Sequence, residues 1–341
     1  MRAASLGNYA ENLERLVFAP LTRTSRTYYL FALLLLAVIG WGFYAYVIQL
    51  RYGLEVTGLN DGVMWGIYIV NFVFFLGIAM AGTVISAVLR LTHAGWRTPV
   101  TRMAEIVTVS ALSIGALMPI IDLGRPDRIV NIMLYGRFQS AIMWDIIVII
   151  TYLVGSLIYL YLPMIPDFAI MRDSMQYEPS GLKKRLLTLL AVGWQNTNEQ
   201  RHRLEKGISV MAVAIVPMAA LTHTVASFIF AWMLRPGWNS TIYGIYFVIG
   251  AIFSGLATIL IVMAIVRKTF HLEEYLTEKH FRYLSYLMLT ALFTYLYLVV
   301  TEFLTLGYKL ELDEKELLTL LFLGHDAPLF WFFILAAFVI P

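Results

Sequence analysis

The chain has 341 residues, of which 60% are hydrophobic and 14% charged, with a net charge of +3 at pH 7. A mean hydropathy of +0.75 is typical of an integral membrane protein and excludes a large soluble domain, and the small net charge gives no support for nucleic-acid binding. The absence of cysteine excludes disulfides, thiolate zinc sites and protein-ligated iron-sulfur clusters of the usual kind.

Seven apolar runs of about 20 residues, each long enough to cross about 30 Å of hydrocarbon as a helix, predict an all-α polytopic bundle. They lie near residues 28–50, 65–91, 103–121, 141–162, 208–232, 243–266 and 283–307. An eighth run, residues 329–341, would span only about 20 Å as a helix. It is either a re-entrant segment or the start of a helix that continues beyond this sequence, and we expect the chain to be incomplete.

Lys and Arg in the connections predict the orientation, because cytoplasmic loops hold the excess of these residues. With the N-terminus inside, the inner segments carry 18 of them and the outer segments 7. Residues 1–27 contain no apolar core followed by a cleavage site, so we expect a cytoplasmic N-terminal segment rather than a cleaved signal peptide, in a multi-pass membrane protein. The charged hairpin at residues 122–128 is then extracytoplasmic.

One internal similarity predicts the domain organisation. Residues 65–70 read WGIYIV and residues 243–248 read YGIYFV, and both open a span from outside. A duplication would give two parallel four-helix units, residues 51–232 and an incomplete second unit at 233–341, with a peripheral first span at 28–50. The alternative is coincidence, because aromatic and small residues recur at membrane interfaces. The long cytoplasmic loop, residues 163–207, contains a basic amphipathic stretch that suits lipid headgroups or, alternatively, a partner.

Polar side chains inside the spans are costly unless they are paired or face a cavity. Several lie at a similar depth near the predicted outer end, and they are Asp122, Asp145, His223, Glu302, Tyr68 and Asn71, with Arg125 in the hairpin. An acid, an imidazole and a guanidinium at one depth on neighbouring spans predict a site in the outer leaflet.

Each of these residues alone also has a structural interpretation. Asp145 would cap the start of its helix, Asp122 would pair with Arg125, and Glu302 would extend to the interface. Near the inner end, Glu105 is a candidate for proton entry, although a helix-start carboxylate facing Arg102 is an equal interpretation. Glycines inside the spans are expected to permit close helix packing.

Quinol oxidation is the chemistry that suits such a layer. A quinol releases two protons with two electrons, so its site needs a base or acceptor for each hydroxyl, and His223 and Asp145 fit this catalytic role. Tyr68, Asn71, Asp122, Arg125 and Glu302 are the other candidate quinone-binding residues. Only His223 lies deep in a span, so we expect no haem b, no bound iron-sulfur cluster and no metal site in this chain. The electrons must then leave through the cofactor of an extracytoplasmic partner.

Several motifs resemble a known family. Three segments resemble the NrfD, or polysulfide reductase, membrane subunits. They are the start of the second span from Trp65 to Tyr68, the turn from Leu123 to Pro126 and the helix start from Ser140 to Asp145. Further segments resemble the quinol-oxidising ActC and the related ActF subunits of alternative complex III, and these are residues 91–102, 165–167, 222–228, 235–242 and 301–303. The resemblance covers nearly the whole chain.

The resemblance implies a helical subunit without cofactors of its own that binds menaquinol or ubiquinol near the outer face. It also implies an iron-sulfur partner subunit, a multihaem cytochrome and a second NrfD-like subunit. Asp145 and His223 match family positions implicated at the quinol site. Two positions depart from the pattern, because Ile229 stands where the branch often has aspartate and Met80 where it often has histidine. Both departures remove polar groups from the expected site.

The sequence therefore predicts the quinone-binding subunit of a respiratory or photosynthetic quinol oxidoreductase. Whether quinol oxidation is coupled to proton translocation is left open by the sequence. One alternative is a companion NrfD-like subunit with a structural or proton-conducting role and no quinol chemistry. A second alternative is a secondary transporter, since paired bundles with midplane charges also describe carriers. The charges here gather in the outer layer, which favours interfacial quinone chemistry over alternating access.

Overall fold

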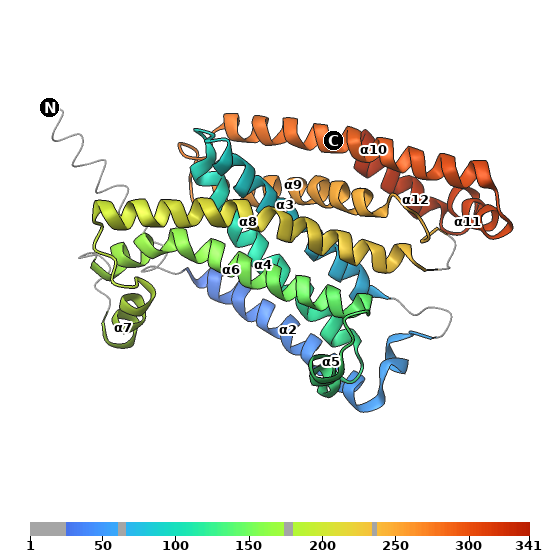
Figure 1. Cartoon of the computed structure of the whole chain (residues 1–341), viewed down its shortest axis with the longest axis horizontal. Helices are drawn as coiled ribbons and strands as arrows, with labels where there is room; N and C mark the ends of the chain where they lie inside the picture. Colours follow the sequence, from blue (N-terminus) through green and yellow to red (C-terminus); the bar gives the residue numbers. More distant parts are fainter. Residues whose placement is uncertain (1–24, 61–65, 174–179, 234–236) are drawn as a thin grey trace. The chain divides into compact units, whose positions relative to one another are not determined.

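The computed structural model describes residues 25–60, 66–173, 180–233 and 237–341. Within these ranges the regular elements are all helices, and no strand occurs. Seven of the described helices are long and apolar enough to cross a membrane, and each overlaps one of the predicted spans. The prediction of an all-α polytopic membrane protein is therefore confirmed (Figure 1).

The chain forms two compact units, which we call the small and the large unit. The small unit comprises Met1–Met64 and Tyr161–Lys206, and the large unit comprises Trp65–Leu160 and Gly207–Pro341. The large unit contains spans from both predicted four-helix units. The chain's second span, residues 67–91, packs directly on its sixth span, residues 243–269. The division at residues 232 and 233 stays a prediction.

The large unit contains most of the spans. In chain order its helices are α3 (Ile67–Leu91), α4 (Arg97–Asp122), the short η2 (Pro126–Arg128) and α5 (Ile129–Tyr135), the first part of α6 (Ala141–Asp173), most of α8 (Asn198–Ala231), α9 (Tyr243–Thr269), α10 (Glu278–Lys309), α11 (Leu312–Leu323), α12 (Ala327–Ile334) and the π-helix η3 (Leu335–Val339). Helix α3 packs against α4 and α9, and α9 packs against α10. These contacts place α3 and α9 at the centre of the unit.

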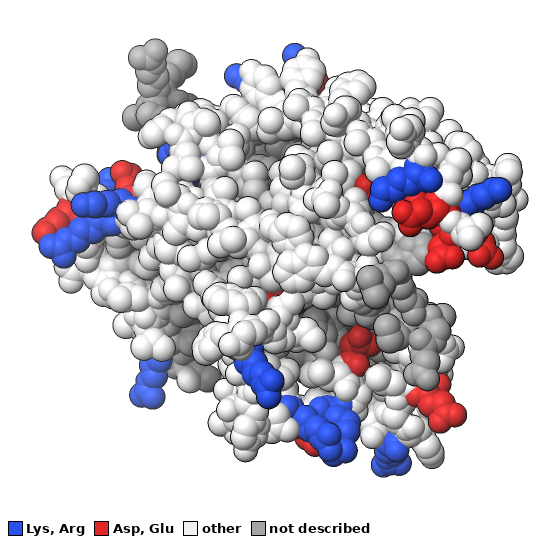
Figure 2. All heavy atoms as spheres, turned by 45° about the vertical axis from the view of Figure 1, so that its right-hand side comes forward, with Lys and Arg blue, Asp and Glu red and all other residues white. Residues whose placement is uncertain are grey.

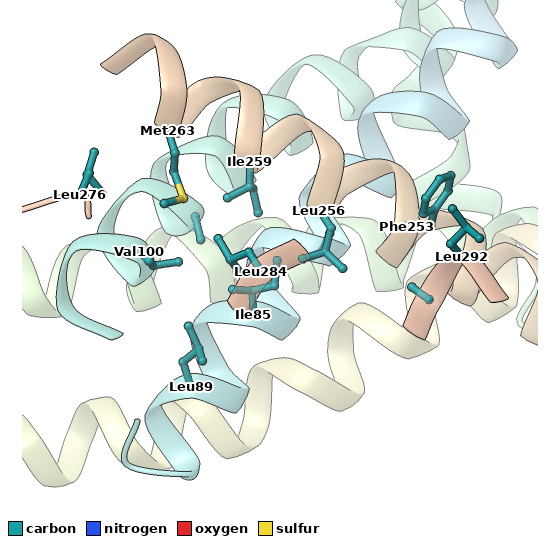
Figure 3. Close-up of a cluster of buried hydrophobic side chains, with 13 residues drawn as sticks. Ile85, Leu89, Val100, Phe253, Leu256, Ile259, Met263, Leu276, Leu284 and Leu292 are labelled. Carbon is teal, nitrogen blue, oxygen red and sulfur yellow. The ribbon is translucent and has the colours of Figure 1, made fainter. Parts of the chain in front are cut away.

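An apolar cluster joins α3, α4, α9 and α10 (Figure 3). Leu256, Ile259 and Met263 recur at helical spacing along α9, and each is at most 1% exposed. They meet Ile85 of α3 and Leu284 of α10 in the same cluster. Since lipid tails are as apolar as these side chains, van der Waals packing rather than removal from water holds the helices together here.

Two glycines set how closely α3 approaches its neighbours. A Cβ at Gly82 of α3 would overlap Thr108 Oγ1 and lie 2.6 Å from the carbonyl oxygen of Ala104 in α4. A Cβ at Gly255 of α9 would overlap the Cβ of Ala81 in α3. The prediction of glycine-mediated helix packing is confirmed at these two positions, because only a residue without a side chain fits.

The predicted eighth run forms α12 and η3, which follow α11 after a sharp bend. The segment Leu312–Leu323 and the segment Ala327–Val339 meet at 72°, so the pair is either one broken span or a re-entrant loop. Phe322 of α11 packs edge-on against Phe330 of α12, with ring centroids 5.0 Å apart. Aromatic contacts of this kind stabilise the bend.

The small unit is built from α2 (Arg26–Tyr52), η1 (Leu54–Thr57), the end of α6, α7 (Gly181–Leu190) and the start of α8. The hydroxyl of Ser25 caps α2 by accepting from the amide of Tyr28 at 3.2 Å. Helix α6 continues eleven residues past its predicted end at residue 162, through Pro163 and Pro166. Packing of Phe168 and Ala169 on Trp194 stabilises this extension, so the predicted loop at residues 163–207 is largely helical.

Charged side chains are sparse on the described surface. On the face shown in Figure 2, Lys, Arg, Asp and Glu form small separate groups, and most of the visible surface carries none. In helix α7, the exposed cations Lys183 and Arg185 lie beside a row of exposed leucines, Leu182, Leu186 and Leu189. An exposed apolar row bordered by cations fits a membrane headgroup layer.

Candidate functional site

His223 lies near the C-terminal end of α8, in the interior of the large unit. The hydroxyl of the preceding residue, Thr222, donates to the carbonyl oxygen of Met218 in its own helix at 2.8 Å and also lies 3.3 Å from the carbonyl oxygen of Val148 in α6, so that this face of α8 meets α6. His223 is 3% exposed, and its Nδ1 lies 3.1 Å from the carbonyl oxygen of Ala219. A carbonyl only accepts, so Nδ1 carries the proton and Nε2 of the neutral ring is an acceptor. Nε2 is buried and makes no hydrogen bond of normal geometry within the described part of the chain, and the ring also faces the backbone of Leu76 in α3.

A cavity of about 380 Å³ lies beside His223. It is lined by residues of α3, α8, α9, α10, α12 and η3, namely Val73, Phe74, Gly77, His223, Tyr246, Phe247, Gly250, Ala251, Phe253, Ser254, Tyr295, Phe333 and Ala337. Most of these side chains are aromatic or aliphatic, and the polar ones are an imidazole, two phenols and a serine. An apolar pocket with a few converging polar groups is the usual form of a small-molecule site.

The two phenols of the cavity wall form a pair. The hydroxyl of Tyr295 in α10 donates to that of Tyr246 in α9 at 3.1 Å, and the two ring centroids are 5.1 Å apart. Further toward the predicted outer end, Glu302 of α10 accepts a hydrogen bond from Ser240 at 2.7 Å. The structure therefore places Glu302 beyond the tyrosine pair, at the connection between α8 and α9.

Asp145 lies in the second turn of α6 and is half-buried. Its Oδ1 is buried and accepts no hydrogen bond from any described residue. It sits one turn from Val148, which receives the bond from Thr222. Asp145 is not among the residues that line the cavity beside His223. It lies in α6, on the side of α8 that Thr222 faces, whereas His223 faces the cavity. The two predicted catalytic residues therefore share a depth but not a pocket.

The other predicted site residues lie at the same end of the large unit but outside the cavity. Tyr68 and Asn71 are half-buried in the first turns of α3. Asp122 is the last residue of α4, with a buried Oδ1 that has no partner in the described part of the chain. Arg125 pairs with Asp127 at 3.4 Å rather than with Asp122, and both partners are more than 60% exposed.

Glu105 belongs to a second buried polar group, between α3, α4 and α6. It is 2% exposed, and its Oε1 accepts a hydrogen bond from Ser86 at 2.7 Å. Ser86 also lies 3.2 Å from the hydroxyl of Tyr159, and Arg90 approaches Glu105 at 3.9 Å. Buried charges are stable only with such partners. The structure thus gives Glu105 a chain of hydroxyl groups and the cation Arg90.

Residues 55–341 match the family described as "Polysulphide reductase, NrfD". The chain belongs to the NrfD family.

Three curated relatives of this NrfD-family chain are reductase or oxidoreductase subunits by name. The chain is 30% identical over 231 residues to a putative dimethyl sulfoxide reductase membrane subunit of Halobacterium salinarum, covering 67% of this chain and 49% of the relative. It is 24% identical to a selenate reductase subunit of Mesobacillus selenatarsenatis, covering 62% and 51%. It is 25% identical to an "Hdr-like menaquinol oxidoreductase integral membrane subunit" of Archaeoglobus fulgidus, covering 93% and 69%. The chain spans about half the length of the first two.

The family match and the long apolar helices agree with the prediction from sequence that this NrfD-family chain is a multi-pass integral membrane protein. The relatives named above are subunits of reductases or oxidoreductases.

The phenols and hydroxyls of both polar groups in this NrfD-family chain were not predicted from the sequence. Tyr246 had a usable signal, because it is the counterpart of Tyr68 in the internal similarity between residues 65–70 and 243–248. Tyr295, Ser86 and Tyr159 had none, since Tyr and Ser inside an apolar span are common in membrane helices. Only the contact of α9 with α10, and of α3 with α6, reveals them.

Proposed function

We propose that this chain is the quinone-binding subunit of a quinol oxidoreductase complex and that the cavity beside His223 holds the quinone ring. The observation that supports this most is the buried acceptor Nε2 of His223 at a largely apolar cavity. An unsatisfied buried acceptor costs about 1–3 kcal/mol, and a quinol hydroxyl is a donor that relieves this cost. The apolar lining suits the ring and its tail.

The proposed reaction removes two electrons and two protons from menaquinol or ubiquinol. His223 accepts one proton at Nε2 while Nδ1 stays bonded to the carbonyl oxygen of Ala219, which fixes the orientation of the ring. The electrons pass to an iron-sulfur cluster in an extracytoplasmic partner subunit, and the quinone leaves. A multihaem cytochrome and a second NrfD-like subunit, as in alternative complex III, are further proposed partners. The proposed location is the bacterial cytoplasmic membrane with the N-terminus inside.

Turnover of a His223→Gln variant tests this proposal. A general base contributes about 10²–10⁴-fold to a rate, so we expect quinol oxidation by the purified complex to fall at least a hundredfold while assembly is retained. His202→Gln is the matched control, because His202 lies exposed on the same helix. Normal turnover in His223→Gln together with loss in Asp145→Asn would move the chemistry to Asp145 and contradict the cavity as the site.

The Glu105 group supports a second candidate, a proton-conducting role. Glu105, Ser86 and Tyr159 form a hydrogen-bonded group in the interior that reaches from α4 across α3 to α6. A carboxyl and hydroxyl groups in contact can pass a proton in the same way as the relays of pumps and transporters. If the cavity takes no quinol, this proton role in a companion subunit is the function that the geometry supports next.

A further inference from the structure

Two tyrosines lie in the cavity wall, and one of them is near the predicted outer end of its helix. Tyr246 lies in the first turn of α9, which begins at Tyr243, and its hydroxyl accepts the hydrogen bond from Tyr295. Both phenols line the cavity. A bonded phenol pair at the wall nearest the outer end is placed to carry a proton out of the cavity.

A carboxylate lies beyond this pair. Glu302 follows Tyr295 by seven residues on α10, which places it on the same helix face about 10.5 Å further along the axis. Its Oε2 accepts the hydrogen bond from Ser240, which lies just before α9 begins and six residues before Tyr246. Glu302 is half-buried. The carboxylate is therefore held at the start of the helix that carries Tyr246, and it is exposed enough to release a proton.

We propose that Tyr295, Tyr246 and Glu302 form the route by which one quinol proton leaves the cavity. The step rests on the proposed function. As the quinol gives up its electrons to the iron-sulfur partner, one O–H bond breaks and the proton joins the oxygen of Tyr295. Tyr295 passes its own proton to Tyr246, which protonates Glu302 through bridging water, and both phenols end neutral. The second quinol proton goes to His223.

The alternative is that these tyrosines belong to the aromatic belt of a membrane protein, where a phenol serves as an amphipathic anchor. The hydrogen bond between two phenols inside a cavity wall argues against this, because belt residues direct the hydroxyl to the headgroup layer. Replacement by Phe separates the two interpretations, since it keeps the ring and removes only the hydroxyl.

The test uses the whole complex, purified through this chain, with Tyr246→Phe, Tyr295→Phe, Glu302→Gln and Glu302→Asp variants. Steady-state quinol oxidation gives kcat and KM, and a pH-indicating dye follows proton release. We expect the two Phe variants and Glu302→Gln to lose at least tenfold in kcat, with KM within twofold of the parent chain. Glu302→Asp should recover part of the loss, because it restores the carboxylate. Tyr297→Phe is the matched control, since Tyr297 is 68% exposed on the same helix.

Three outcomes overturn this route in different ways. Normal kcat in both Phe variants, with an inactive His223→Gln, removes the route and leaves the proposed function standing. A raised KM with unchanged kcat makes the tyrosines contacts of the quinone head rather than proton carriers. Absence of quinol oxidation in the parent complex overturns the proposed function and this route together. Equal thermal stability of the variants excludes misfolding as the cause of a loss.

Discussion

Replacement of Gly255 by Ala should loosen the helix pair that forms one wall of the cavity. Gly255 follows Ser254, a lining residue, and it lies at a close contact between α9 and α3. The new methyl would overlap the Cβ of Ala81 and lie 3.2 and 3.3 Å from the carbonyl oxygens of Ile78 and Gly77. Backbone oxygens cannot turn aside as a flexible side chain can, so the two helices must separate.

The magnitude follows from two opposing contributions. Overpacking a close contact costs about 1–3 kcal/mol, whereas Ala is favoured over Gly inside a helix by about 0.5–1 kcal/mol. The steric cost is the larger contribution, so we expect a net destabilisation of about 1–2 kcal/mol. Since the moving helix carries Tyr246, Gly250 and Ala251 of the cavity wall, quinol oxidation should fall as well.

Thermal unfolding of the purified protein in detergent measures the loss of stability. An assay of quinol oxidation measures the loss of activity. Gly244→Ala on the same helix is the matched control, because its Cβ would meet its nearest neighbour, Phe228 Cζ, at an ordinary 3.6 Å. The control should be as stable as the parent chain or slightly more so. If Gly255→Ala is as stable as Gly244→Ala, the close α3–α9 contact does not exist as described.

The remaining predictions concern the two charged regions outside the cavity. Glu105→Gln keeps an acceptor for Ser86 and loses the charge near Arg90. The complex reconstituted in membranes should therefore move fewer protons per electron, while uncoupled quinol oxidation is retained. Glu199→Gln is the control, because Glu199 is exposed on α8. Unchanged proton movement would leave Glu105 as a structural carboxylate. Arg125→Lys should change turnover less than twofold and stability by less than about 1 kcal/mol, because an exposed ion pair contributes little. A tenfold loss of turnover would show that Arg125 acts at the site.

The helices could be predicted from the sequence because a span is a property of local composition. Each of the seven predicted spans overlaps a long apolar helix. The ends were less predictable. Pro163 and Pro166 suggested an exit from the membrane, yet α6 continues through both. A proline removes one backbone donor, and packing of residues far apart in the sequence, such as Phe168 on Trp194, decides whether the helix survives it.

Counting residues from the span ends predicts how far along their helices Asp145 and His223 lie. It does not predict the direction in which each side chain points around its helix. Which face of α8 meets α6 and which meets the cavity depends on tertiary contacts, such as that of Thr222 with Val148. For the same reason the sequence did not predict Tyr295 as a site residue, because its role depends on a hydrogen bond to Tyr246 in a neighbouring helix.

Photoaffinity labelling of the complex with an azidoquinone, followed by mass spectrometry of this chain, tests whether the cavity beside His223 holds the quinone. We expect labels on residues of α9 and α10 that line the cavity, Tyr246 and Tyr295 among them, and competition by excess quinol. Labels confined to the first turns of α6 around Asp145, or to the hairpin that carries Arg125, would contradict it.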